Sequence, residues 1–219
     1  MAIRAFLFDF DGLILDTETA SRAGWEWLYR EHGHELPPEK WELVVGTTGA
    51  WSPMDHLEEL AGVPLERDAL NERRYAHELS LIEAEELRPG IADYLAAAER
   101  HGLKRAIVSS SSRRWIDLHL ARLEREVGWD AILTANGDHS RAKPNPVLYL
   151  EALETLGVRA DEAVVFEDSP NGVRAGKAAG IFTVGIPNSV TRDYGLDEAD
   201  LVVDSLADLP PDELLARFS

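Results

Sequence analysis

The 219-residue sequence predicts an α/β fold in which a parallel sheet carries helices on both faces. Short apolar runs alternate with helical patterns along most of the chain, which is typical of such a sheet. One long interval, residues 17–86, instead contains helical segments and no convincing strand. Because a domain has ~150 residues, we expect one large α/β core with a helical insert after its first strand.

Six apolar runs are interpreted as short buried strands. They cover residues 3–8, 104–109, 131–135, 163–166, 181–184 and 201–203. Helical patterns between most of them cover residues 90–101, 113–126, 145–156 and 171–179, and a last short helix is expected over 213–219. Several of these patterns begin at Pro, Ser or Asn and end at Gly, as helices commonly do.

The insert is interpreted as a small acidic helical bundle. It holds 16 acidic and 6 basic residues, a net charge of −10, and Pro or Gly interrupts it at residues 37–38, 46–53 and 62–64. Four of the six Trp residues lie in it, and such large apolar side chains suit the core of a small bundle: Trp25, Trp27, Trp41 and Trp51. We therefore predict a core domain of residues 1–16 and 87–219 and a helical cap domain of residues 17–86.

Composition excludes several classes of protein. No apolar run approaches the ~20 residues of a membrane helix, and the first residues lack the pattern of a signal peptide. The chain has no Cys, which excludes disulfides and thiolate ligands and is typical of a reducing compartment. We expect a cytoplasmic protein that works as a monomer without a membrane partner.

The net charge of −18 limits the choice of ligand. Such a surface repels nucleic acid, so we expect no nucleic-acid partner. It also repels phosphorylated metabolites, unless a metal ion and a few well-placed cations reverse the field locally.

Polar side chains follow the predicted strands at the point where each strand ends. In a parallel α/β sheet, ligands bind outside the carboxyl ends of the strands, so these residues should meet in one crevice. They are Asp9 and Asp11 after the first strand, Ser109 to Ser112 after the second, Lys143 before a later helix, and Glu167 and Asp168 after the fourth strand. Carboxylates so close together must share protons or a cation, and Mg²⁺ prefers oxygen ligands of this kind.

Four segments in this order resemble the four motifs of the haloacid dehalogenase superfamily. They read FLFDFDGLILDTE, IVSSSS, KPNPVLYL and VVFEDSPNGVRAGKAAG. The resemblance covers the whole chain and points to the phosphatase and phosphomutase branch, in which a helical cap follows the first motif. It implies a Rossmann-like doubly wound parallel sheet, a Mg²⁺ cofactor and a small phosphate ester as substrate.

The resemblance also implies a role for each motif residue. Asp9 is the nucleophile that attacks phosphorus, and Asp11 is the general acid and base. Ser110 binds the transferred phosphoryl group and Lys143 is its cationic partner. The expected metal-binding acids are Asp9, Asp11, Glu167 and Asp168. Ser109 is the alternative to Ser110 because four consecutive serines leave the register open, Ser111 is a further substrate contact, and Ser112 is better explained as the start of a helix.

The cap favours a phosphatase over a sugar phosphomutase of the β-phosphoglucomutase type. In the related mutases, a His after the first motif and an Arg in a cap loop handle the sugar and its second phosphate. Here Ser21 lies where that His is expected, and the loop VVGTTGAWSPM has no Arg. Arg22 is the candidate substitute that leaves the mutase open, and Thr48 and Trp51 are expected over the mouth of the crevice.

A hypothesis of another class is a non-catalytic phosphate or metal sensor that resembles a receiver domain. A receiver domain lacks a helical insert of this length after its first strand, so the insert favours the enzyme. We predict hydrolysis of a small sugar-phosphate-like metabolite through an aspartyl phosphate.

Overall fold

The computed structural model describes residues 2–41, 43–46, 51–124 and 128–218. Its centre is a six-stranded sheet in which every pairing is parallel, in the order β3-β2-β1-β4-β5-β6. The strands are β1 (Ala5–Phe8), β2 (Lys104–Ser109), β3 (Ala131–Thr134), β4 (Ala163–Glu167), β5 (Phe182–Gly185) and β6 (Leu201–Val202). This is the predicted doubly wound sheet, and each strand lies within two residues of its expected ends.

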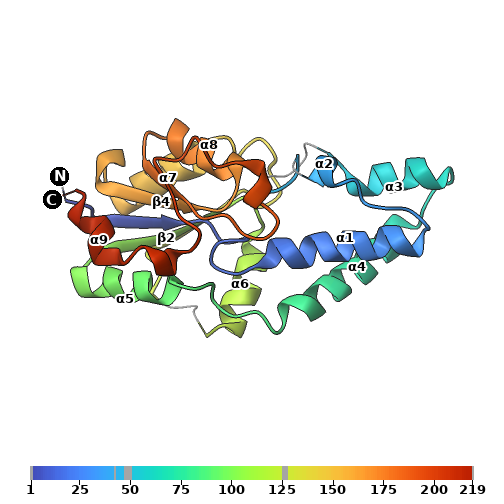
Figure 1. Ribbon diagram of the computed structural model, residues 1–219, viewed down its shortest axis with the longest axis horizontal. Coiled ribbons are helices and arrows are strands. Elements are labelled where there is room, and N and C mark those ends of the chain that lie inside the picture. Colours follow the sequence, from blue (N-terminus) through green and yellow to red (C-terminus); the bar gives the residue numbers. More distant parts are fainter. Residues whose placement is uncertain (1, 42, 47–50, 125–127, 219) are drawn as a thin grey trace.

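Helices cover both faces of the sheet (Figure 1). On one face lie α7 (Val147–Leu156) and α8 (Pro170–Ala178), and on the other lie α5 (Ile91–His101), α6 (Arg113–Arg122) and α9 (Pro211–Ala216). Short 3₁₀ turns lie in the core at Ala160–Glu162, Arg192–Tyr194 and Leu206–Asp208.

The central strand β1 is buried on both faces, which explains its uninterrupted apolar sequence. Phe6 and Phe8 belong to the apolar cluster beneath α5 and α6, whereas Ala5 and Leu7 belong to the cluster beneath α7 and α8. Alternate side chains of a strand point to opposite faces of the sheet, so a strand with two covered faces needs apolar residues throughout. Phe166 of β4 stacks on Phe8 with ring centroids 4.9 Å apart.

In its described residues, the predicted insert forms four helices that extend from the end of the core (Figure 1). They are α1 (Thr17–Glu31), α2 (Pro38–Trp41), α3 (Pro53–Ala61) and α4 (Arg67–Ile82). Asp16 caps α1 by accepting a hydrogen bond from the Thr19 backbone N–H at 3.1 Å. The insert has its own apolar cluster, in which Trp41 is buried and three further Trp residues are partly buried: Trp25, Trp27 and Trp51.

One prediction about local structure can be checked at the start of α6. Ser112 caps α6 and accepts from the Trp115 backbone N–H at 3.2 Å, which confirms it as a helix start. Gly172 and Gly176 allow close helix-to-sheet packing, because an added Cβ would lie 1.8 Å from Glu167 Oε2 and 2.7 Å from Thr183 Oγ1 respectively.

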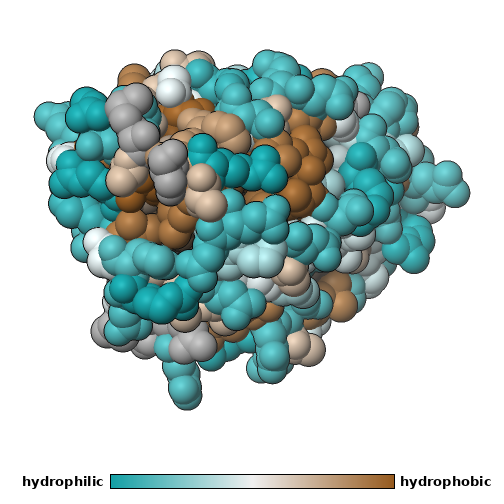
Figure 2. All heavy atoms as spheres, turned by 60° about the vertical axis from the view of Figure 1, so that its left-hand side comes forward, coloured by the Kyte–Doolittle hydropathy of each residue, from teal (hydrophilic) through white to brown (hydrophobic). Residues whose placement is uncertain are grey.

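The end of the core opposite the insert carries both chain termini (Figure 1). Figure 2 is turned toward this end and shows apolar patches within a mostly hydrophilic surface. A hollow of about 480 Å³ at the amino ends of β4 and β5 is lined in part by Ile181, Phe182 and Phe218. Within the described ranges, no helix is long and apolar enough to cross a membrane.

Candidate active site

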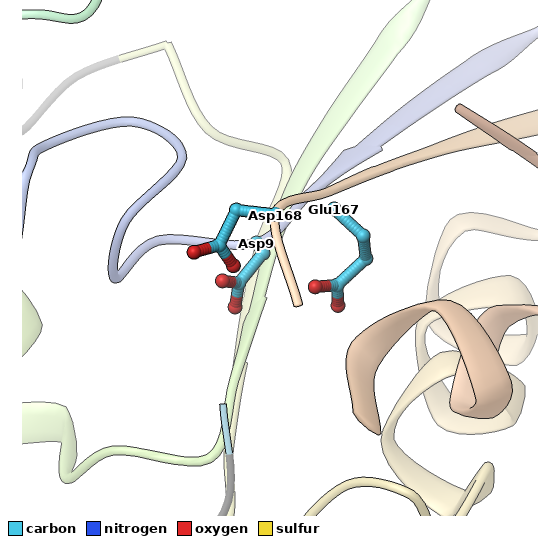
Figure 3. A group of neighbouring side chains, drawn as sticks. All are labelled: Asp9, Glu167 and Asp168. Atoms are coloured by element: carbon cyan, nitrogen blue, oxygen red, sulfur yellow. The ribbon is translucent and has the colours of Figure 1, made fainter. Parts of the chain in front are cut away.

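Three buried carboxylates meet where β1 and β4 end. Asp9 directly follows β1, Glu167 is the last residue of β4, and Asp168 follows it. Each offers an oxygen within 4.8 Å of the oxygens of the other two, and each side chain is at most 5% exposed. In Figure 3, the carboxylates of Asp9 and Asp168 approach one another, and Glu167 lies to one side of them. The adjacent parallel strands therefore bring these acids together, as the sequence predicted.

Lys143 supplies a buried positive charge to this group. Its Nζ contacts Asp9 Oδ1 and lies 2.6 Å from Glu167 Oε1, and the Tyr149 hydroxyl donates to the same Glu167 oxygen. Burial alone would lower the pKa of Lys143, but the charges of Asp9 and Glu167 hold it above the ordinary value. Lys143 is therefore a permanent cation beside the expected nucleophile.

Lys143 by itself does not balance three acids. Burial raises the pKa of Asp9 to about 8, and repulsion from Glu167 adds to this effect while Lys143 opposes it. Burial likewise raises the pKa of Asp168 well above its ordinary value, with the charge of Asp9 contributing. The group therefore favours either protonation or an additional cation.

Asp11 occupies a different environment from Asp9. Its Oδ1 accepts from Thr17 Oγ1 at 2.9 Å and from Trp115 Nε1 at 2.6 Å, and its Oδ2 accepts from Ser109 Oγ at 3.1 Å and Ser111 Oγ at 2.7 Å. Four donors occupy both oxygens, and the carboxylate is not part of the group formed by the other acids. The structure thus separates Asp11 from the predicted metal-binding set.

The consecutive serines also have different partners. Ser110 Oγ accepts from the Lys143 backbone N–H at 3.1 Å and donates to the Gly46 carbonyl at 3.2 Å. Ser109 and Ser111 both donate to Asp11 instead. Ser110 therefore connects the Lys143 segment with the insert, whereas its neighbours orient Asp11.

A cavity of about 250 Å³ lies between the core and the insert. From the core it is lined by both aspartates of the first motif, three serines and one Trp: Asp9, Asp11, Ser109, Ser110, Ser111 and Trp115. From the insert it is lined mainly by residues of α1 and α4: Thr17, Glu18, Ser21, Trp25, Gly46, Arg74, Tyr75 and Glu78. Residues of the core therefore line one side of the cavity, and residues of the insert line the other side.

Two of the sequence-predicted cap contacts are not found in this lining. Arg22 pairs with Glu26 at 2.9 Å on α1 and does not line the cavity. Trp51 packs against the apolar cluster of the insert, with its ring 5.5 Å from that of His56. Both side chains contact other residues of the insert instead. Thr48 lies outside the described residues.

Several site residues were missed by the sequence reasoning. Asn188 Nδ2 donates to Asp168 Oδ2 at 2.7 Å, and Tyr149 holds Glu167. Asn188 lies three residues after β5, so the rule that directed attention to the carboxyl ends of strands also applies to it. Arg74 and Trp115 lie inside helices, where no local signal distinguishes them from ordinary surface residues.

The parallel sheet, the acids at its carboxyl edge and the covering helical insert define an α/β protein with an acidic site between a core and a helical insert. A sequence profile of the haloacid dehalogenase-like hydrolase family matches residues 3–180, so the chain belongs to this family. The relatives of this chain include named phosphatases that match it over nearly its whole length. The chain is an enzyme that hydrolyses phosphoric monoesters.

Individual similarities extend over almost all of the chain. It is 40% identical over 207 residues to YhcW of Bacillus subtilis (strain 168), with 94% of each chain covered. It is 31% identical to hexitol phosphatase A of Escherichia coli (strain K12), with 94% of this chain and 93% of the relative covered. A crystal structure of a CbbY variant from Rhodobacter sphaeroides in complex with xylulose-(1,5)bisphosphate is similar in fold, with a TM-score of 0.76, 29% identity, and coverage of 94% and 96%.

Proposed function

We propose that the protein is a Mg²⁺-dependent phosphatase that hydrolyses a small sugar-phosphate-like monoester through an aspartyl phosphate on Asp9. The observation that carries this proposal is the contrast between two carboxylates that line one cavity. Asp9 lies beside a buried cation and other acids, whereas Asp11 is surrounded by hydroxyl groups and an indole N–H. The two environments suit a nucleophile and a proton carrier respectively.

The acidic group fits a divalent cation. Asp168 Oδ1 and Glu167 Oε2 are buried and accept no hydrogen bond from the described part of the chain. Together with Asp9 they form a set of oxygen donors of the kind that Mg²⁺ takes. When bound, the cation would neutralise the charge of the phosphate ester and favour the ionised carboxylate of Asp9.

The residues of this chain then divide the reaction into two steps. In the first, Asp9 attacks phosphorus and the bond to the ester oxygen breaks, while Asp11 passes a proton to the departing alkoxide. In the second, Asp11 removes a proton from water, which attacks the phosphorus of the aspartyl phosphate and releases phosphate with Asp9 regenerated. We assign the transferred oxygens to Lys143, whose Nζ contacts Asp9, and to Ser110, which lines the cavity.

A sugar-like substrate is supported by the relatives, since one is named for hexitols. Hydrolysis rather than mutase chemistry is supported by Ser21, which lines the cavity at the position where related mutases are expected to have His. A hydroxyl side chain carries no charge to hold a second phosphate.

Aryl phosphate hydrolysis tests the proposal. We expect phosphate release that EDTA abolishes and Mg²⁺ restores. With Asp9→Asn, no product should form even from this good leaving group. With Asp11→Asn, a burst of phenol should precede a slow steady state, because attack by Asp9 persists but water lacks its base. Mass spectrometry should locate the phosphoryl group on the peptide containing Asp9, and a label on Ser109 to Ser112 instead would overturn the mechanism.

A further inference from the structure

The cap side of the cavity contains one basic side chain among its described lining residues, and that charge is already balanced. Arg74 Nη1 lies 2.6 Å from Glu78 Oε2, one turn further along α4. The two side chains are only 14% and 7% exposed, so water screens the pair weakly. Arg74 therefore adds no net positive charge to this part of the cavity.

Contacts with α1 hold Arg74 in place. Its guanidinium carbon lies 4.7 Å from the ring centroid of Trp25. An added Cβ at Gly24 would lie 3.5 Å from Arg74 Cγ, so the stem of the arginine packs against α1 at a point without a side chain. Figure 1 shows α1 and α4 running side by side along the insert.

The remaining cap-side groups suit hydroxyl groups rather than phosphate. Glu18 and Glu78 offer carboxylate oxygens, and Ser21 offers a hydroxyl. Trp25 and the core residue Trp115 offer ring faces, which pack against the C–H groups of a sugar or polyol. A second phosphate would meet the acid Glu18 and an Arg74–Glu78 pair that has no net charge, and burying a charge without a partner is costly.

We infer that the cap side of this cavity selects an uncharged polyhydroxyl group, so that the substrate is the monophosphate of a neutral sugar or polyol and bisphosphates are rejected. The inference rests on the proposed function, because it assumes that the phosphate end binds at Asp9 and Lys143. The cavity volume of about 250 Å³ suits one small ligand of this kind.

Direct binding separates this inference from the proposed reaction. Calorimetric titration of the Asp9→Asn protein in Mg²⁺ compares a six-carbon polyol monophosphate with the corresponding bisphosphate, and needs no turnover. We expect the monophosphate to bind at least ~100-fold more tightly, because the second phosphate lacks a free cation. Equal or tighter binding of the bisphosphate overturns the inference. If the wild-type protein does not hydrolyse aryl phosphate, that result counts against the proposed function instead.

Two further variants in the Asp9→Asn background test the role of the ion pair. Glu78→Gln leaves Arg74 charged but unpaired, and the preference for the monophosphate should fall by ~10-fold or more. Arg74→Gln should move the preference in the opposite direction. Unchanged ratios in both variants contradict the inference.

The matched control is Glu26→Gln. Glu26 pairs with Arg22 at the same spacing on α1, at 2.9 Å, but neither residue lines the cavity. In the Glu26→Gln variant, the ratio of monophosphate affinity to bisphosphate affinity should equal that of the Asp9→Asn protein. A shift as large as that of Glu78→Gln would show that general charge, not the cavity, sets the preference.

Discussion

Replacing Lys143 by Met should destabilise the metal-free protein strongly. Lys143 is 1% exposed, and its ammonium contacts Asp9 and Glu167, so the substitution leaves buried acids without their cation. Removing one partner of a buried ion pair costs about 3–5 kcal/mol. For a chain of this size, that corresponds to a fall in Tm of roughly 6–20 °C.

Added Mg²⁺ should reverse part of this loss. The metal would supply positive charge to the same three carboxylates, so its stabilising effect should be larger in Lys143→Met than in the wild type. Turnover should remain low in the variant even with Mg²⁺, because the cation that holds the transferred oxygens is missing.

Thermal unfolding in EDTA and in Mg²⁺ measures both effects. Lys177→Met is the matched control, since Lys177 pairs with Asp200 at 2.5 Å but the two side chains are 36% and 28% exposed. An exposed pair contributes at most ~1 kcal/mol, so this variant should unfold close to the wild type and respond equally to Mg²⁺. The reasoning is refuted if Lys143→Met unfolds in EDTA at the wild-type temperature, or gains no more from Mg²⁺ than the control does.

Three shorter predictions concern individual contacts. Trp115→Phe removes the N–H that Asp11 Oδ1 accepts at 2.6 Å, and hydrolysis of the aspartyl phosphate should slow by ~10-fold, visible as a burst; an unchanged steady-state rate would contradict this. Asp168→Ala should weaken Mg²⁺ binding in calorimetry more than Glu167→Ala, because Glu167 already contacts Lys143 and accepts a hydrogen bond from Tyr149. The reverse order would reassign the ligands. Burial lowers the pKa of His119 from 6.5 to about 4, so below pH 6.5 the unfolded chain binds a proton that the folded protein does not. Stability should therefore fall from pH 6.5 to 4 by up to about 1.4 kcal/mol per pH unit, and urea unfolding of His119→Leu should show a shallower fall than the wild type.

The arrangement of the core could be predicted because its signals are local. A strand buried on both faces must be apolar throughout, and Pro, Ser and Gly mark the ends of its neighbours, so β1 and α8 were found close to their observed ends. The carboxyl-end rule then brought Asp9, Glu167 and Asp168 together without knowledge of any side-chain position. The hydrogen-bond partners of Asp11 were beyond this reasoning, because Trp115 reaches it from inside another helix.

The sequence by itself determined the sheet, the helical nature of the insert and the order of the motif residues along the chain. Only the tertiary structure decided which cap residues face the cavity. Arg22 and Arg74 each have a Glu four residues later on a helix, and local pattern does not distinguish them. Packing of α1 against α4 turns Arg74 into the cavity and leaves Arg22 outside it. Helical periodicity relates residues on one helix to each other, but the orientation of that helix depends on contacts with segments distant in the chain.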